Sequence, residues 1–427
     1  MGGNGEVIRM AKKNLKKYRV NSFFAGIGGF DVAFEKCGFK TIMLCEIDSF
    51  CNKVLNKHWP KTKKLDNIIT ATPEDIDEAE VWCGGFPCQD ISLARGRNGR
   101  PGLDGERSGL FYTYADLISE KAPSVVVIEN VQGLFSSNGG RDFGIILQRM
   151  TSMGYCVAWR LVNSRYFGVP QSRTRVYICC WKSSVEKALR VMFDQEGAHV
   201  IKNERKGFLT ECISSNEFPK VPEVSYCIAA TTGRHTGTDW SRTYVVCEDG
   251  IRRLTPIECE RLQGFPDDWT LIENEVDINS LRYKAIGNAV SVPVVQWMAS
   301  RIHKELDSKA PSMSKESVKE FVPEFSKSEW SSEKLSDIDF SDVTKEYKWE
   351  WAGIACDNSY IQGKVAPAPY EVKKSKLIDL IQKERQEDEF YISPNASEGI
   401  LRRVDRAGRT LFQPLREALE KEINKTK

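Results

Sequence analysis

The loop sequence EVWCGGFPCQDIS occupies residues 80–92, and the architecture predicted for the rest of the chain depends on it. Its apolar start, Val81 to Cys83, predicts the end of a buried strand, and two glycines then allow a sharp turn. Pro87 keeps the chain extended before Cys88, so the turn can present a thiol to a cleft instead of to the core. A thiol whose pKa is lowered is a strong nucleophile, whereas most free cysteines are small buried apolar residues. Both interpretations of Cys88 remain open on this stretch alone.

The composition indicates a protein with a substantial core. Its 427 residues suffice for two or three domains, or for one large α/β domain with appendages, and 41% of them are hydrophobic. The formal net charge of +2 does not by itself argue for or against nucleic acid. There is no apolar stretch long enough for a membrane span, and residues 1–17 are too polar for a secretory signal. The 13 cysteines show no CxxC spacing and there are 4 histidines, so we expect no metal site and an intracellular protein whose cysteines mostly fill the core.

A glycine-rich turn precedes this loop in the chain. Residues 19–24 predict a strand, and the sequence AGIGGF at 25–30 then predicts a turn that opens a helix ending near Cys37. Such a turn presents backbone amides to a cofactor. A second predicted strand, residues 40–44, ends just before Glu46, whose carboxylate can accept hydrogen bonds from ribose hydroxyls. The glycine spacing GxGG departs from GxGxxG, so a dinucleotide fits poorly, and ordinary strand-to-helix chemistry is the alternative.

Three segments after the loop carry charge. The basic, glycine-rich residues 95–102 predict either a solvated linker or a loop that closes over an anionic substrate. The apolar residues 125–128 predict a central strand ending at Glu129, and a carboxylate buried there needs a partner or a function. Arg173 and Arg175 lie two positions apart on an extended segment, so they share a face that could clamp a phosphate or a polarised carbonyl.

Seven segments in one order carry a resemblance to a known family. They read FAGIGGF, CEID, GGFPCQDIS, VVVIENV, QSRTRVYI, RRLTPIECERLQGFP and IGNAVSVPV. In this order and spacing they resemble the DNA (cytosine-5)-methyltransferases over residues 19–300. The resemblance implies an α/β fold with a doubly wound, mostly parallel, Rossmann-like sheet that binds S-adenosylmethionine beyond the carboxyl ends of its strands. It also implies a smaller target-recognition domain across a DNA cleft.

The resemblance assigns the chemistry to four residues. Cytosine carbon 5 is too weak a nucleophile to take a methyl group, and adding the Cys88 thiolate at carbon 6 activates it. Glu129 matches the carboxyl that holds ring nitrogen 3 and the exocyclic amine, and Arg175 matches the arginine near the base carbonyl. Arg173, in the same motif, is expected to contact the backbone and the cysteine loop. A target cytosine in a duplex must be flipped out of the helix to reach these groups.

The resemblance also assigns a cofactor site and a DNA surface. We expect S-adenosylmethionine to contact 10 residues: Phe24, Gly26, Gly28, Glu46, Asp66, Ile68, Pro87, Leu110, Asn288 and Val290. For Glu46, Asp66 and Asn288 the alternative is ordinary helix or turn capping. We expect DNA contacts from 9 residues: Gln89, Arg95, Arg97, Gln171, Thr231, Arg234, His235, Arg402 and Arg403.

The block from Arg253 to Pro266 resembles a family motif that is easily mistaken for a site. We expect it to be architectural, with Arg253, Glu258 and Arg261 ordering the smaller domain by ion pairs.

The chain divides into six predicted parts. They are a flexible basic lead-in (1–18), a catalytic domain that binds the cofactor (19–182), a small target-recognition domain (183–275), a return segment completing the catalytic domain (276–305), a linker (306–345) and a C-terminal helical extension (346–427). The Ser, Lys and Glu content of the linker predicts poor order. Within the extension, residues 376–385 and 396–418 show helical periodicity. The second stretch carries a basic face that is either a solvated surface or a second DNA-contacting module: Arg402, Arg403, Arg406 and Arg409.

Three other functions are compatible with parts of this pattern. A tRNA cytosine-5 methyltransferase has the same fold and chemistry, but the FPCQ loop, residues 95–102 and the extension favour DNA. A catalytically silent DNA-binding scaffold has no need for the intact PCQ, ENV and QxRxR motifs. A Cys/His hydrolase would need a histidine recognisably paired with Cys88. We therefore expect a monomeric cytoplasmic enzyme, prokaryotic or phage-encoded, that acts on duplex DNA without metal or membrane, with a cognate restriction endonuclease as a further partner at the same DNA site.

Overall fold

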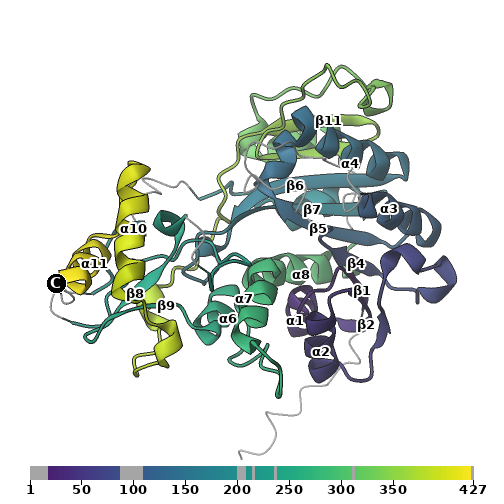
Figure 1. Ribbon diagram of the computed structural model, residues 1–427. Coiled ribbons are helices and arrows are strands. Elements are labelled where there is room, and N and C mark those ends of the chain that lie inside the picture. The colour runs from purple at the N-terminus through teal and green to yellow at the C-terminus, as the bar shows by residue number, and fades with distance from the viewer. Residues whose placement is uncertain are drawn as a thin grey trace, which may run out of the picture.

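The computed structural model describes residues 18–86, 109–199, 208–213, 217–234, 238–309 and 313–424. A large sheet covered by helices forms one part of the molecule, and a smaller group of strands and helices lies beside it (Figure 1). The C-terminal helices belong to the smaller group, although the chain first adds two strands to the large sheet (Figure 1).

The first five strands form the parallel half of a 9-stranded sheet. They pair in the order β3-β2-β1-β4-β5, and every pair is parallel. Their bounds are Arg19–Phe23 (β1), Lys40–Cys45 (β2), Lys63–Leu65 (β3), Val81–Gly84 (β4) and Val125–Val131 (β5). The chain winds outward from β1 through β2 and β3 on one side and through β4 and β5 on the other, so the strand order switches between β1 and β4. The predicted doubly wound sheet is confirmed.

Four further strands complete this sheet. Strand β7 (Thr174–Lys182) is antiparallel to both β5 and β6 (Tyr155–Asn163), so β6 runs in the direction of β5. Strand β10 (Ala352–Cys356) pairs antiparallel with β6, and β11 (Ser359–Gly363) pairs antiparallel with β10 at the edge. Strands β7 and β10 thus run against the other strands of the sheet, which is mixed but mostly parallel, as predicted.

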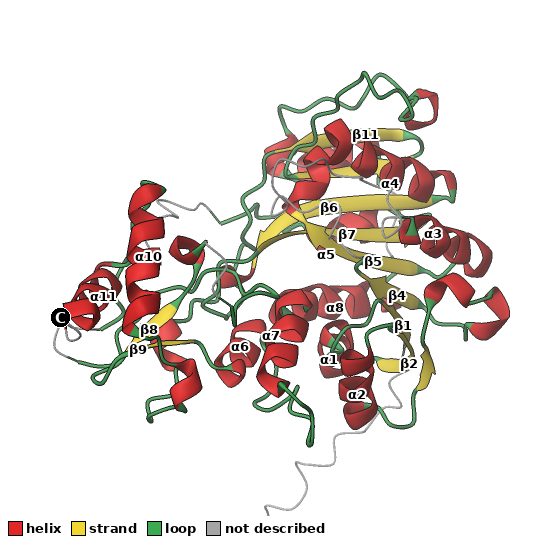
Figure 2. Cartoon of the chain, in the orientation of Figure 1, coloured by secondary structure: helices red, strands yellow, loops and turns green. Residues whose placement is uncertain are grey.

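Alternate residues of the central strands enter two cores, one on each face of the sheet. In β5, Val125 and Val127 belong to one core and Val126 and Ile128 to the other, and all of them are fully buried. A run of apolar residues buried on both faces suits a central parallel strand. Helices cover both faces (Figure 2): α1 (Gly29–Lys36), α2 (Ser49–His58), α5 (Val185–Met192) and α8 (Val292–Asp307) on the first core, α3 (Leu110–Lys121) and α4 (Arg141–Ser152) on the second.

The smaller group is built on a two-stranded sheet of β8 (Tyr244–Val246) and β9 (Ile251–Arg253). A separate core joins these strands to the apolar faces of α10 (Pro394–Arg406) and α11 (Gln413–Asn424). Helices α6 (Pro256–Gln263) and α7 (Ile278–Asn288) lie between this group and the large sheet (Figure 1).

The helical predictions for the C-terminal part hold in outline. Gly408, with φ of +60°, separates α10 from α11, where the sequence predicted one helical stretch. Residues 376–385, also predicted to be helical, contain the 3₁₀ turn Leu377–Asp379.

The segment predicted to be a linker, residues 306–345, packs against the large sheet instead. It contains α9 (Lys315–Phe321), and its Leu335 and Phe340 are buried in the same core as α4. Gly144 on α4 makes room for Phe340, because a Cβ at that position would lie 2.1 Å from the Phe340 ring. The prediction missed this packing because the few apolar residues are scattered through a polar sequence and meet their partners only in the folded sheet.

The extension predicted to be helical begins with the hairpin of β10 and β11. Asp357 and Asn358 at its turn have φ of +48° and +65°, the backbone of a tight hairpin turn. Cys356 at the end of β10 forms a disulfide with Cys156 of β6, while the other described cysteines are free. The helical prediction is therefore corrected for residues 352–363, and the division of the chain into domains stays a prediction.

Candidate active site

The glycine turn after β1 meets the acid after β2 at the carboxyl end of the sheet. The Gly26 amide donates to Glu46 Oε2 at 2.7 Å. Glu46 Oε1 accepts the amides of Ile47 and Asp48 at 2.9 and 2.8 Å. A carboxylate has about four acceptor positions, so capacity remains for a ligand hydroxyl. Gly26 itself has φ of +55°, and a Cβ there would meet no described atom within 4 Å, so the turn leaves open space beside the acid.

Three more residues of the predicted cofactor set lie around this turn. The Phe24 ring lies edge-on to Tyr114 of α3, with 5.9 Å between the ring centroids. Leu110, at the start of α3, packs against the same core as Phe24. Val290 lies against the start of α1, because a Cβ at Gly29 would lie 2.8 Å from the Val290 side chain. Segments far apart in the chain therefore meet beside the glycine turn.

The other described members of that set differ in exposure. Ile68 is buried, whereas Asp66 and Asn288 are exposed. Gly28 has φ of +82°, and a Cβ there would lie 2.4 Å from the Trp59 ring, so only glycine fits. Pro87 lies outside the described residues.

Glu129 projects from β5 and is nearly buried. Its side chain is 11% exposed, and Arg175 Nε on the neighbouring strand β7 lies 3.2 Å from Glu129 Oε1. Burial raises the pKa of Glu129, and the guanidiniums of Arg175 and Arg173 offset part of that rise. Oε1 accepts no hydrogen bond of good geometry from the described residues. A buried carboxylate oxygen without a donor favours a ligand that supplies one.

The cysteine loop begins beside Glu129. A Cβ at Gly85 would lie 2.8 Å from the Glu129 carbonyl oxygen and 3.4 Å from Oε2, so a larger residue would collide with the acid. Gly85 precedes Cys88 by three positions. The predicted residues of the loop lie outside the described part of the chain: Cys88, Gln89, Arg95 and Arg97.

Arg173 is turned away from Glu129 and toward backbone carbonyls. Its Nη1 donates to Ile228 O at 2.9 Å and to Gly287 O at 3.3 Å, and its Nη2 donates to Ala289 O at 2.8 Å. The residue is 3% exposed. The expected backbone contacts are present, but these partners give Arg173 a structural role, which corrects its place in the predicted catalytic set.

Gln171 is fully buried, which corrects the DNA contact expected of it. Its Nε2 donates to Leu262 O at 2.9 Å, and its Oε1 accepts the Ile228 amide at 2.9 Å. The side chain therefore ties the segment before β7 to α6 and to the chain that leads toward β8.

Cys227 is a member of this cluster that the sequence did not predict. Its Sγ lies 3.5 Å from Arg173 Nη1 and 3.8 Å from Arg175 Nη2. No motif singles out this cysteine, because its neighbours come from β7 in the folded state. Burial acts to raise the pKa of the Cys227 thiol, but Arg175 and Arg173 outweigh burial and lower it.

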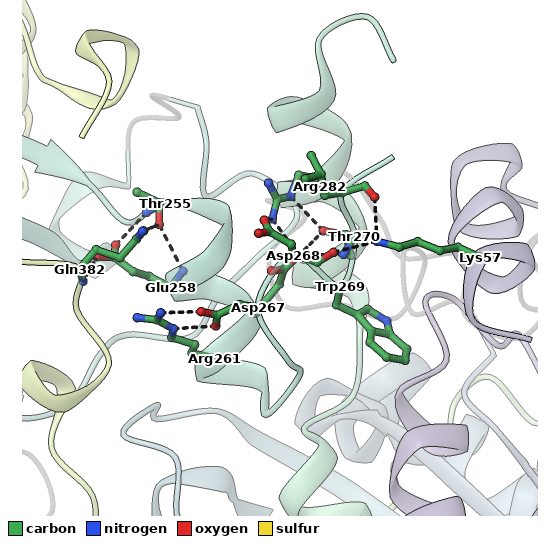
Figure 3. Close-up of polar contacts among 12 residues, drawn as sticks. Lys57, Thr255, Glu258, Arg261, Asp267, Asp268, Trp269, Thr270, Arg282 and Gln382 are labelled. Carbon is green, nitrogen blue, oxygen red and sulfur yellow. Dashed lines mark hydrogen bonds and ion pairs between the residues drawn. The ribbon is translucent and has the colours of Figure 1, made fainter. Parts of the chain in front are cut away.

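The block predicted to be architectural is held by buried ion pairs, with one change of partner. Arg252, not Arg253, pairs with Glu258 through two hydrogen bonds of 2.7 and 2.9 Å, and both side chains are buried. Arg253 donates to Gly233 O at 3.0 Å. Arg261 pairs with Asp267, as Figure 3 shows, and this confirms the ion pair expected of Arg261.

A second polar cluster lies between α6 and α7 in Figure 3. Arg282 Nη2 donates to buried Glu260 Oε1 at 3.1 Å and to Asp268 at 3.2 Å. Thr255 Oγ1 donates at 2.6 Å to Gln382 Oε1, so the C-terminal segment completes the contacts of α6 (Figure 3). These contacts support an architectural role for the block.

The predicted base-reading loop is exposed in part. Thr231 and Arg234 are both exposed, and Arg234 Nη2 donates to Ser280 Oγ of α7 at 3.3 Å. Thr231 Oγ1 accepts a hydrogen bond of 3.0 Å from Arg242 Nη2. His235 lies outside the described residues.

The arginines of α10 have different roles. Arg403 Nε lies 2.7 Å from Asp239 Oδ2, and the Asp239 side chain is fully buried, so Arg403 anchors the helix and its predicted DNA contact is corrected. Arg402 is exposed, as are Arg406 and Arg409. The Arg409 guanidinium lies 6.0 Å from the Trp240 ring centroid.

The described residues contain no group of three or more His, Cys, Asp or Glu side chains that could hold a metal ion. In the same part of the chain, every helix is too short or too polar to cross a membrane.

Comparison with known families identifies this arrangement. The chain matches the family of C-5 cytosine-specific DNA methylases over residues 18–224 and 199–304. It belongs to this family. As a cytosine-5 DNA methyltransferase it is an enzyme, and its methyl donor is S-adenosylmethionine. The open space at Gly26 and the remaining acceptor capacity of Glu46 fit that cofactor.

Two relatives illustrate the match. The chain is 32% identical over 303 residues to the Type II methyltransferase M2.BsuMI of Bacillus subtilis (strain 168), covering 66% of this chain and 75% of that protein. It is 30% identical over 303 residues to the Type II methyltransferase M.NgoBI of Neisseria gonorrhoeae, covering 65% and 91%. The family match ends at residue 304, so α9 to α11 lie beyond it.

Solved structures show the same fold. The Entamoeba histolytica methyltransferase EhMeth superposes with a TM-score of 0.52 at 18% identity, over 69% of this chain and 100% of that one. The S. pombe Dnmt2 methyltransferase superposes with a TM-score of 0.51 at 19% identity, over 68% and 100%. At these identities the likeness concerns the fold alone.

Proposed function

We propose that this methyltransferase transfers a methyl group to carbon 5 of a flipped-out cytosine in a specific duplex DNA sequence, through a transient bond between Cys88 and carbon 6. The observation that carries the proposal is the nearly buried Glu129 carboxyl, whose Oε1 has no hydrogen-bond donor among the described residues. Gly85, three positions before Cys88, lies against that same acid. A pyrimidine edge entering there would supply the missing donor.

Each residue of this site has a distinct task in the proposal. The Cys88 thiolate attacks carbon 6, which makes carbon 5 nucleophilic. Glu129, whose pKa is raised by burial, holds ring nitrogen 3 and the exocyclic amine as charge develops on the ring. Arg175 orients Glu129 and faces the base carbonyl. After methyl transfer, carbon 5 loses a proton and the electron pair of that C–H bond expels the thiolate.

S-adenosylmethionine supplies the electrophilic methyl group. We propose that the segment around the glycine turn holds its adenosine part, with Glu46 accepting from the ribose hydroxyls and the Phe24 ring lying against the adenine. The remaining residues proposed to line this pocket are Gly26, Gly28, Asp66, Ile68, Pro87, Leu110, Asn288 and Val290.

The DNA surface is proposed to combine the cysteine loop with the smaller group. On the loop side it contains Gln89, Arg95 and Arg97. On the side of the smaller group it contains Thr231, Arg234, His235 and Arg402. We propose a monomer as the active form, since the predicted site is complete within one chain, and a cognate restriction endonuclease as a partner that reads the same sequence.

The decisive experiment uses labelled S-adenosylmethionine with duplex DNA and, in parallel, with tRNA. Label on cytosine carbon 5 of DNA is expected for the wild-type protein, and label on tRNA alone would replace the proposal by the RNA alternative. Cys88→Ser should abolish transfer and retain cofactor binding. Cys37→Ser is the matched control, because Cys37 caps the end of α1 away from the glycine turn. Transfer by Cys88→Ser would contradict the role of Cys88.

A further inference from the structure

A buried cluster of charges surrounds Glu129. Strand β7 and the residues before it contribute the guanidiniums of Arg173 and Arg175, and β5 contributes the carboxylate of Glu129. Two cations and one anion leave an excess positive charge in a poorly solvated place, which is costly. Cys227 Sγ lies 3.5 Å from one guanidinium and 3.8 Å from the other, so a thiolate there would balance the cluster.

Cys227 stands apart from the other cysteines in its surroundings. For nine free cysteines of the described chain, burial raises the pKa of the thiol: Cys37, Cys45, Cys51, Cys83, Cys179, Cys180, Cys212, Cys247 and Cys259. At Cys227 the two arginines reverse that effect. The phenol of Tyr177 shares the field of Glu129 and these arginines, and its pKa is raised mainly by burial. Helix α7 adds the Gly287 carbonyl, which accepts from Arg173.

The two arginines depend on Cys227 to different degrees. Arg173 is already held by the carbonyls of Ile228 and Ala289, at 2.9 and 2.8 Å. Arg175 Nη1 donates to the carbonyl of its neighbour Thr174 at 2.8 Å, while its Nε faces Glu129 and its Nη2 faces Cys227. The thiolate is therefore an anchor at the end of the Arg175 side chain, opposite the contact with Glu129.

We propose that Cys227 is a positioning residue for methyl transfer: as a thiolate it holds the Arg175 guanidinium against Glu129 and balances the charge of the cluster. The inference rests on the proposed function of Glu129 and Arg175, and it adds a residue of the recognition segment to their support. The thiol proton leaves to solvent when the thiolate forms, and no other bond changes.

The test compares Cys227→Ser, Cys227→Asp and the control Cys247→Ser, which removes a thiol from the turn between β8 and β9. We measure kcat and KM for duplex DNA across the pH range. For wild type, kcat should rise with pH as the thiolate forms. Cys227→Ser should lose this rise and lower kcat about tenfold, the effect of one lost charge-assisted hydrogen bond, with KM for the cofactor unchanged. Cys227→Asp keeps a negative charge and should restore much of kcat without the rise.

A second measurement does not depend on turnover. The ultraviolet absorbance of the thiolate, taken as the difference between wild type and Cys227→Ser, should show an ionised thiol at pH values where Cys247 remains neutral. A neutral Cys227 at the pH of full activity, or a wild-type pH profile in Cys227→Ser, would overturn the inference. If wild type itself transfers no methyl group, the proposed function fails while the absorbance still decides the state of Cys227.

Discussion

Arg403 Nε of α10 lies 2.7 Å from Asp239 Oδ2 in the turn before β8, across 164 positions of sequence. The Asp239 side chain is fully buried, and its Oδ1 accepts a 3.0 Å hydrogen bond from Tyr244. The pair joins the end of the chain to the smaller group, whose core α10 and α11 complete. The smaller group therefore contains a part that the family match, which ends at residue 304, does not include.

Removing Arg403 should destabilise the smaller group. Arg403→Ala leaves the Asp239 carboxylate buried without its cation, and breaking such a pair costs about 3 kcal/mol, less where water reaches the site. Urea unfolding followed by tryptophan fluorescence measures the change. Arg402→Ala, an exposed neighbour, should change the free energy of unfolding by no more than about 0.5 kcal/mol. Equal effects of the two substitutions would show that the pair contributes nothing.

The outer face of α10 should bind DNA phosphates. Arg402 and Arg406 lie one turn apart and are exposed, so replacing both by Ala should weaken duplex binding and lower the salt dependence by about one unit per lost phosphate contact. Binding isotherms at several salt concentrations measure both effects. Lys334→Ala, an exposed cation beside the large sheet, is the matched control.

Point substitutions serve this test better than removal of residues 306–427. Such a deletion would strip β10 and β11 from the large sheet and expose core residues. Unchanged affinity and unchanged salt dependence in the double variant would mean that the basic face is only a solvated surface.

Arg173 and Arg175 should separate stability from chemistry. Arg173→Ala leaves the carbonyls of Ile228 and Ala289 without this donor, at about 1–3 kcal/mol for each buried unsatisfied group, so the midpoint of thermal unfolding should fall. Arg175→Ala removes the cation beside Glu129 and should lower kcat about 100-fold with a smaller change in unfolding. Differential scanning fluorimetry and methyl-transfer assays on both variants check this. A reversal of the two effects would exchange their roles.

Asp31 should make stability depend on pH. This residue of α1 is fully buried, accepts hydrogen bonds from Ser22 and Thr41 at 3.0 Å each, and burial raises its pKa to about 7. Between the unfolded value near 4 and about 7, the folded state holds a proton that the unfolded state has lost. Its contribution to stability is therefore present at low pH and falls as pH rises through this window, by at most about 1.4 kcal/mol per pH unit.

Asp31→Asn removes that titration. The free energy of unfolding, measured by urea at several pH values, should decline more steeply between pH 4 and 7 for wild type than for the variant, where other groups set the slope. Parallel curves for the two proteins would show that Asp31 titrates alike in both states.

Local sequence patterns were enough to predict the strands and helices of the large sheet. The apolar run at residues 125–128 and the glycines after β1 determine the backbone there through neighbours close in the chain, so β5 and the glycine turn formed where expected. Strands β10 and β11 were missed, because each has only five residues and gains its stability from pairing at the edge of β6. The turn residues Asp357 and Asn358 were the local signal for them.

The sequence by itself determined which chemical groups stand at the strand ends, among them Glu46 and Glu129, because the end of a buried apolar run marks where a polar side chain reaches the edge of the sheet. Only the tertiary structure decided what the arginines do. Arg173 faces carbonyls, Arg175 faces an acid, and Arg403 neutralises a buried carboxylate, although all of them read as exposed cations in the chain. The physical reason is that burial and the choice of partner are set by segments many positions away.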